Sequence, residues 1–481
     1  MPRTESLSNL TFLEMESLPT EVLLYIFESL QESFSPKSSP NESSKNLAQV
    51  CLTCRRFQDI ATPLLYRDID LYSPSRVARL LDTLILHPNL INHVKKVRRR
   101  RYFRALAFDS DDGAFSKLFQ GEGNIFTKEL PPAIERLLYK FQKHEDTIIS
   151  RLNYSDDPIF AILIFLLPQL EDLSCMIAAN FWLEGLGCSG SGKISDTIDS
   201  FQNLRSLCVE LRGSEVKAAE IPLLFRMPTL VDLTIIGFGS WCRDAWHIPH
   251  KQEDWPVRSA TIERLTLTVS YCHVDIVSSA VRTCKALKSF QCTGTANPSP
   301  RNQQYYTILS SVLLEHADTL KTLVLNDTQL GFSSFHYERI MSTNNFVSLE
   351  TFELPFYMLV GWDNQPHEKI ERFIPPKITT LMLDVPQESA DRISGRCFDW
   401  FFLALCRACL AGQFLALKKI CIRYHETLSG SLELGLDFVK LREMFLACDV
   451  SFDVCVYILH QAEMKRRKCS HTVIYTVSMI S

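Results

Sequence analysis

The chain has 481 residues and a formal net charge of −4, with 51 lysines and arginines against 55 aspartates and glutamates. Apolar residues make up 46 % and charged residues 22 %, which is typical of a globular protein and excludes a wholly disordered chain. The slightly acidic balance provides no overall positive field for nucleic acid or an anionic membrane, so we expect neither partner. The longest apolar run, residues 160–167, is far shorter than the roughly 20 residues of a membrane-spanning helix.

The N-terminus carries no feature of a secretory signal. Four glutamates precede the first apolar run, and no small-residue cleavage site follows it. We therefore expect a cytoplasmic location, a nuclear location or both. The 16 cysteines are too few for a disulfide scaffold, and in a reducing compartment they should stay thiols.

Patterns of composition divide the chain into five segments. They are an N-terminal tail (1–16), a short helical region (17–66) with a flexible Ser/Pro-rich insertion (31–46), a connecting region with the first irregular repeats (67–155), a repeat region (156–460) and a basic tail with a candidate edge strand (461–481).

The helical region begins with an apolar helix that is predicted to run from Leu18 to Leu30. Proline suits the first turn of a helix, and Glu21 complements its positive end. One apolar face follows helical spacing and contains Leu23, Ile26, Phe27 and Leu30. Val22, Leu24 and Tyr25 make the other sides apolar as well. A surface helix needs only one apolar stripe. The rest of this small region can cover one apolar face of the helix, and a partner should cover the other.

Two further helices are predicted after the insertion. Asn46 is the expected N-cap of one, which carries Leu47, Val50 and Cys51, and Thr53 caps the other, which carries Phe57, Ile60 and Ala61 and ends at Pro63. Without the insertion only about 35 residues remain, a size that rarely folds unaided. Size alone thus implies a partner.

These residues give the region a specific likeness. The pattern of Leu18-Pro19-x-Glu21-Val22-Leu23, Val50-Cys51 and Phe57, followed by Leu65-Tyr66, resembles an F-box, and in particular those of the large fungal F-box family. The resemblance implies that an adaptor-binding face and a small F-box core are made by Leu18, Pro19, Glu21, Val22, Leu23, Ile26, Phe27, Leu30, Val50, Cys51 and Phe57.

The resemblance also implies a function. It suggests the substrate-recognition subunit of an SCF-type (Skp, cullin, F-box) ubiquitin ligase, which binds a Skp-type adaptor and, through it, the cullin and RING subunits. Such a receptor is not an enzyme and needs neither catalytic residues nor a cofactor or metal. The alternative is an interaction or scaffold protein that works outside a ubiquitin ligase.

A short motif, apolar-x-x-apolar-x-apolar, recurs nine times between Leu170 and Ile422. Successive copies start 25 to 39 residues apart, about 31 on average, and stretches with helical spacing separate them. This alternation predicts an α/β fold, either an irregular leucine-rich-repeat-like solenoid or a β/α barrel. Barrel strands are buried on both faces, whereas these alternate apolar and polar residues, which favours the solenoid.

The polar positions of the predicted strands should line one concave face that binds an unknown target protein. We assign to it Glu210, Asp232, Arg264, Gln291, Asn326, Glu353, Asp384 and Arg423. Their charges are of both signs, so they do not predict whether the target is acidic or basic. The inner Asn or Cys of leucine-rich repeats is missing, which leaves the repeat boundaries open.

Motifs for other chemistry are weak. Gly187 to Lys193 fits a phosphate-binding loop, but Ile194 replaces the Ser or Thr that would hold Mg²⁺. Cys51-x-x-Cys54 and Cys406-x-x-Cys409 have metal-type spacing without a second pair, and we interpret them as core thiols. The basic run 95–101 fits a nuclear-import signal, a patch for an anionic partner, or a solvated strand edge and turn.

Overall fold

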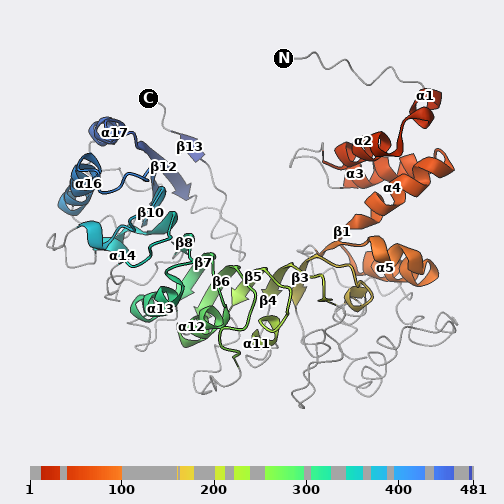
Figure 1. Ribbon diagram of the computed structural model, residues 1–481, viewed down its shortest axis with the longest axis horizontal. Helices are drawn as coiled ribbons and strands as arrows, with labels where there is room; N and C mark the ends of the chain where they lie inside the picture. Colours follow the sequence, from red (N-terminus) through yellow and green to blue (C-terminus); the bar gives the residue numbers. More distant parts are fainter. Residues whose placement is uncertain are drawn as a thin grey trace. The chain divides into compact units, whose positions relative to one another are not determined.

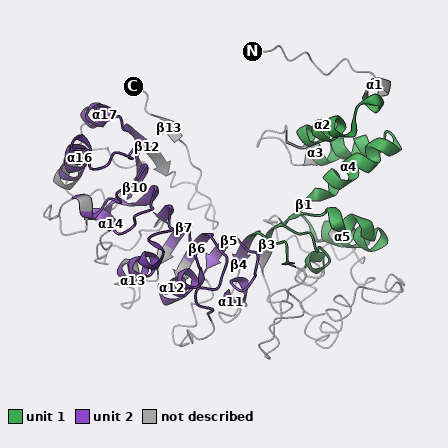
Figure 2. Cartoon of the chain, in the orientation of Figure 1, with its two compact units in different colours: residues 1–207 green, residues 208–481 purple. Residues whose placement is uncertain are grey.

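A computed structural model describes residues 12–32, 41–99, 160, 163–177, 201–211, 221–238, 255–272, 274–296, 305–326, 343–360, 370–386, 395–427, 438–459 and 476–478. The chain divides into two compact units, which are residues 1–207 and residues 208–481 (Figure 2). The predicted repeat region, 156–460, therefore extends across this division. In the described part of the chain, no helix is long and apolar enough to cross a membrane.

Unit 1 opens with four helices, drawn in red and orange in Figure 1. They are α1 (Phe12–Ser17), α2 (Thr20–Glu32), α3 (Asn41–Cys51) and α4 (Arg55–Arg67). Their buried core consists of Leu23, Phe27, Leu47, Phe57, Ala61 and Leu64. The rings of Phe27 and Phe57 meet edge to face with centroids 5.5 Å apart, joining α2 to α4.

Two of these helices differ from the sequence prediction at their ends. Helix α3 begins at Asn41, five residues before the expected cap, so part of the presumed insertion is helical. Helix α4 is capped by Cys54, whose Sγ accepts from the Phe57 N–H, and it continues past Pro63 to Arg67. Burial of Leu64 in the core offsets the hydrogen bond that a proline costs a helix.

The rest of unit 1 contains the first strands. In chain order follow β1 (Asp68–Leu71), α5 (Pro74–Leu86), the 3-10 helix η2 (Pro88–His93), β2 (Lys96–Arg99) and β3 (Asp172–Ile177). Strand β2 pairs in parallel with β1 on one side and with β3 on the other. Residues 96–99 of the basic run thus form an inner strand rather than the strand edge that the sequence suggested, and Val97 on it is buried.

Unit 2 consists of parallel strands that alternate with helices. Strand β4 (Ser206–Leu211) lies at the division and is followed by α11 (Ile221–Leu224), β5 (Asp232–Phe238), β6 (Arg264–Cys272), α12 (Val274–Thr283), β7 (Ser289–Ala296), α13 (Tyr305–Leu313), η9 (Leu314–His316), β8 (Thr322–Asn326), β9 (Thr351–Pro355), α14 (Phe356–Val360), η10 (Ile370–Arg372), β10 (Thr380–Pro386), α16 (Gly395–Leu410), β11 (Lys419–Thr427), α17 (Phe438–Leu446), β12 (Ser451–Leu459) and β13 (Thr476–Ser478).

The strands of unit 2 lie side by side in the order of the sequence. Each strand from β5 to β11 pairs in parallel with the next, and β13 pairs antiparallel with β12. The α/β class and the helical N-terminal region are confirmed. Sequential parallel strands are common to both predicted architectures, the solenoid and the barrel.

The core of unit 2 lies between the sheet and its helices. The apolar positions of each motif, such as Leu265 and Leu267 on β6, are buried, as are Val277, Ala280 and Val281 on α12. Figure 1 shows α12 and α13 on the same side of the row of strands. The opposite face carries the polar positions of the motifs and is called the polar face below.

Side-chain hydrogen bonds join the segments that immediately precede neighbouring strands. The residue that precedes the first apolar position of a motif donates to a backbone carbonyl next to the preceding strand. These bonds run from Asn203 to Pro168 (3.0 Å), from Thr261 to Pro228 (3.1 Å) and Leu230 (2.8 Å), from Thr319 to Leu287 (2.9 Å) and from Ser348 to Asp318 (2.8 Å). We call the four donors, Asn203, Thr261, Thr319 and Ser348, the polar ladder. They precede the strands, whereas the inner Asn or Cys of leucine-rich repeats, which this chain lacks, would follow them.

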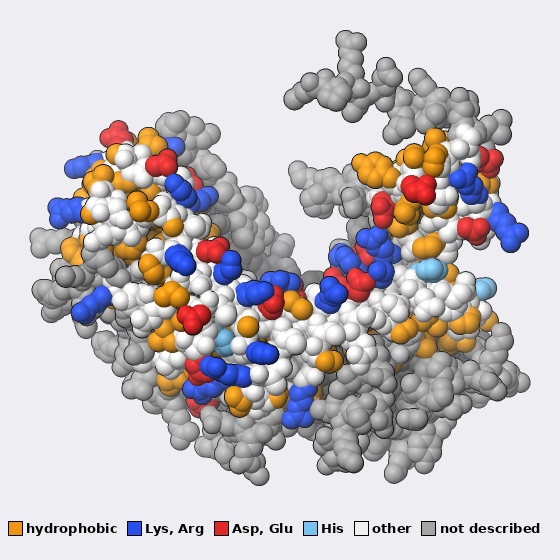
Figure 3. All heavy atoms as spheres, viewed as in Figure 1, with side chains coloured by type: hydrophobic (Ala, Val, Ile, Leu, Met, Phe, Trp, Pro, Cys, Tyr) orange, Lys and Arg blue, Asp and Glu red, His pale blue; other side chains and the backbone are white. Residues whose placement is uncertain are grey.

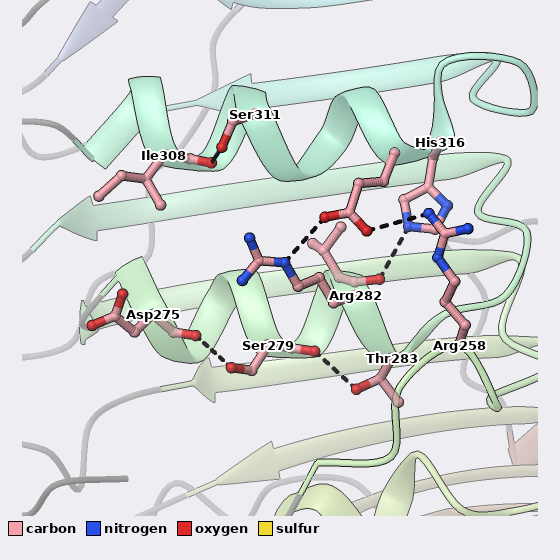
Figure 4. Close-up of polar contacts among 10 residues, drawn as sticks. Arg258, Asp275, Ser279, Arg282, Thr283, Ile308, Ser311 and His316 are labelled. Carbon is pink, nitrogen blue, oxygen red and sulfur yellow. Dashed lines mark hydrogen bonds and ion pairs between the residues drawn. The ribbon is translucent and has the colours of Figure 1, made fainter. Parts of the chain in front are cut away.

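One buried histidine also joins neighbouring segments of unit 2 (Figure 4). Nε2 of His316 lies 3.2 Å from the carbonyl of Val281, and Nδ1 accepts from the Leu287 N–H at 3.5 Å. Glu315 pairs with both Arg258 and Arg282 beside it. Burial is the main cause that lowers the pKa of His316 below its usual 6.5, which favours the neutral ring.

Candidate functional site

Helix α2 exposes apolar side chains next to its buried face. Leu23 and Phe27 are buried, whereas Val22, Leu24 and Tyr25 are 41 %, 39 % and 72 % exposed. Val22 and Tyr25 are three residues apart and so share one side of the helix. Figure 3 shows apolar side chains gathered on the surface of these helices. We call Val22, Leu24 and Tyr25 the outer surface of α2.

The structure separates the predicted F-box residues into three groups. Leu23, Phe27 and Phe57 are core residues. Leu18, Ile26, Leu30, Val50 and Cys51 are half-buried and pack against that core. Pro19, Glu21 and Val22 are exposed. Leu24 and Tyr25 are outside the assigned site residues, although the sequence already indicated, from the apolar side chains on the other sides of this helix, that a partner should cover them.

Hydrogen bonds and an ion pair hold the entry of α2 against α4. Arg56 donates to the carbonyls of Glu16 and Leu18, which lie three residues and one residue before Pro19. Arg67 pairs with Glu28 at 3.2 Å, so both ends of α4 contact the first helices. These contacts fix the orientation of α2 and therefore of its outer surface.

The polar face of unit 2 is the second candidate surface. The predicted target-binding positions from Asp232 to Arg423 lie on its strands, and alternation places them on the same face. Glu210 occupies the corresponding side of β4 and is half-buried. They occupy several rows across the strands, since Arg264 is in register with Ser289 and Asp384 with Arg423.

The charged residues of this face bind one another. Nε and Nη2 of Arg264 each lie 2.6 Å from a carboxylate oxygen of Asp232, in a bidentate pair. Lys419 pairs with Asp453 at 3.3 Å. Figure 3 shows basic and acidic side chains next to one another in this unit.

A buried ion-pair cluster joins β9, β10 and β11. Arg423 binds Asp384 with Nε–Oδ1 and Nη2–Oδ2 distances of 2.6 and 3.1 Å and also contacts Glu353. Asp384 is 2 % exposed and Glu353 9 % exposed, so these two positions are not solvated as a polar strand face would suggest. Burial raises the pKa of Asp384 to about 6, against the lowering effect of Arg423.

Between these charged groups the polar face is uncharged. We call Thr266, Thr268, Gln291, Thr293, Val324 and Asn326, on strands β6, β7 and β8, the neutral band. All six are half-buried, and the hydroxyls of Thr268 and Thr293 lie 3.4 Å apart. Hydroxyl and amide groups both donate and accept, so this band can bind polar groups without charge.

The other chemical motifs do not converge on a site in the described part of the chain. No group of three His, Cys, Asp or Glu residues there could hold a metal ion. Cys54 caps a helix, and Cys406 is buried with its Sγ 3.9 Å from that of Cys448. Burial raises the pKa of Cys406 to about 11, which makes it a poor nucleophile. The glycine-rich segment 187–193 lies outside the described residues.

Comparison with known protein families matches the N-terminal part of the chain. The F-box-like family matches residues 15–72, which include α2, α3, α4 and β1. Residues 15–72 form an F-box-like domain. No curated protein matches the chain. The match covers the outer surface of α2 and none of unit 2.

Proposed function

We propose that this chain is the substrate-recognition subunit of an SCF-type ubiquitin ligase. In this role the F-box-like domain binds a Skp-type adaptor, which recruits the cullin and RING subunits, and unit 2 binds a target protein. The chain carries out no covalent chemistry. Its contribution is to raise the effective concentration of target lysines near the ubiquitin-loaded enzyme.

One observation carries the proposal: the outer surface of α2 exposes apolar side chains within an F-box-like domain. F-box-like domains generally bind Skp-type adaptors, and the exposed apolar side chains of Val22, Leu24 and Tyr25 offer such a partner a surface. A helix bundle would cover them by helix-in-groove docking. The small core of six buried residues explains why this domain gains stability from a partner.

For unit 2 we propose a leucine-rich-repeat-like solenoid whose polar face holds the target. Sequential parallel strands, alternating burial on strands such as β4 and β8, and the polar ladder between neighbouring strands support it. A wet sheet face is typical of an open array, whereas barrel strands are buried on both sides.

The adaptor-binding proposal is tested by affinity purification of the full chain and quantitative mass spectrometry. Val22→Glu/Tyr25→Glu should lower recovery of the Skp-type adaptor at least about tenfold, because two charges would enter an apolar interface. The matched control is Leu86→Glu on α5, an exposed apolar residue outside the F-box-like match. Equal recovery from all three proteins would refute the proposal, provided that all three unfold at the same temperature.

A scaffold that works outside a ligase is the second candidate. The exposed surface of α2 would serve both roles, because both need the adaptor. Recovery of cullin together with the adaptor, and of ubiquitylated proteins, supports the ligase. Adaptor without cullin supports the scaffold.

A further inference from the structure

Arginine and lysine side chains of the polar face are paired with carboxylates, so they present few free charges to a charged ligand. Arg264 is held by Asp232, and Arg423 by Asp384 and Glu353. Lys419 faces Asp453. Phosphate recognition uses guanidinium groups that are free to form bidentate hydrogen bonds, and both arginines already form them within the sheet. Ligand binding through charge would have to break these pairs.

The neutral band differs from the charged groups around it because its two side-chain amides form no hydrogen bond with the described residues. Gln291 and Asn326 make no side-chain hydrogen bond to any residue that the structure describes, and both are half-buried rather than fully solvated. They lie on neighbouring strands, since Gln291 is in register with Val324 and Thr293 with Asn326. The two residues are thus offset by two residues along the strand direction, about 7 Å, and by one strand spacing across it, about 4.8 Å, so their backbone positions are roughly 8 Å apart.

We propose that the neutral band binds an uncharged, extended polypeptide segment of the target through its backbone. This inference rests on the proposed function of unit 2 and names the chemistry of its ligand. Every second residue of an extended chain is about 7 Å apart, so the side chains of Gln291 and Asn326 reach alternate peptide groups of a chain that crosses β7 and β8 obliquely. Each amide can donate to a carbonyl and accept from an N–H. Thr266, Thr268 and Thr293 add hydroxyls beside them, and no phosphate is required.

The test uses purified full chain and libraries of short synthetic peptides. One library is uncharged, and matched libraries carry a central phosphoserine, aspartate or lysine; a glycan array is screened in parallel. We expect the uncharged library to be retained, with an affinity that changes less than about twofold between low and high salt. Gln291→Leu/Asn326→Leu should weaken the selected peptides about tenfold, because several neutral hydrogen bonds are lost.

Two controls keep this test decisive. Ser451→Ala changes an exposed position of β12 on the same face and should bind peptides as the wild type does. Gln291→Glu/Asn326→Asp keeps the side-chain size and should also weaken binding, which excludes a purely steric effect of leucine. Thermal unfolding of each variant shows that the fold is intact.

Several outcomes would overturn the inference. They are preferential retention of phosphorylated or charged peptides, retention of glycans alone, retention of no peptide, and unchanged affinity in both double variants. Adaptor recovery is measured on the same preparations. If the adaptor binds and peptide binding does not depend on the band, this inference fails while adaptor binding stands. If peptide binding depends on the band and the adaptor does not bind, the adaptor-binding proposal fails while this inference stands.

Discussion

Asp384 shows how one carboxyl group makes stability depend on pH. Its pKa is raised from 3.8 to about 6 by burial, so the folded state binds its proton more tightly than the unfolded state does. A carboxyl shifted in this direction contributes most stability below its unfolded pKa, and the contribution is lost as pH rises through the folded pKa. The relevant window is therefore pH 4 to about 6.

We expect the wild type to lose about 1 kcal/mol of unfolding free energy, relative to Asp384→Asn, between pH 5 and pH 7. The asparagine cannot ionise, so its stability lacks this dependence. Urea denaturation at both pH values measures the difference, and Ser451→Ala serves as a control that should follow the wild type. Parallel pH profiles of wild type and Asp384→Asn would contradict the shift.

The polar ladder shows how neighbouring strands are kept in order. Thr319 donates to the Leu287 carbonyl at 2.9 Å, and without this donor that oxygen would lose a partner. Thr319→Val should therefore lower the unfolding free energy by about 1 kcal/mol. Thr266→Val is the matched control, because it makes the same change on a strand face where the structure gives the hydroxyl no hydrogen bond. Equal denaturation midpoints would show that the ladder does not stabilise the sheet.

Predictability differed between helices for a physical reason. Spacing placed Leu23 and Phe27 on the buried face of α2, because helical geometry is local. The start of α3 at Asn41 was missed, since polar Ser-rich residues give no apolar period. Likewise α4 continues past Pro63 because Leu64 is buried against distant residues, which no local rule reports.

The proposed solenoid makes a prediction about the size of the protein. A compact chain of this length would have a radius of gyration of about 23 Å. An open array with an F-box-like domain should exceed that value clearly, because its first and last strands do not close on each other. Small-angle X-ray scattering of the monodisperse full chain measures the radius, and a value near that of a compact globule would favour the barrel.

The amino-acid pattern was enough to predict the helical F-box-like region and the alternating strands and helices, because both follow from periods of a few residues. Only the tertiary structure showed that Arg423 meets Glu353, which is 70 residues away, and that Asp384 beside them is buried. It also left Gln291 and Asn326 open on adjacent strands. Pairing across strands depends on register and burial, and these are properties of the assembled sheet rather than of any one segment.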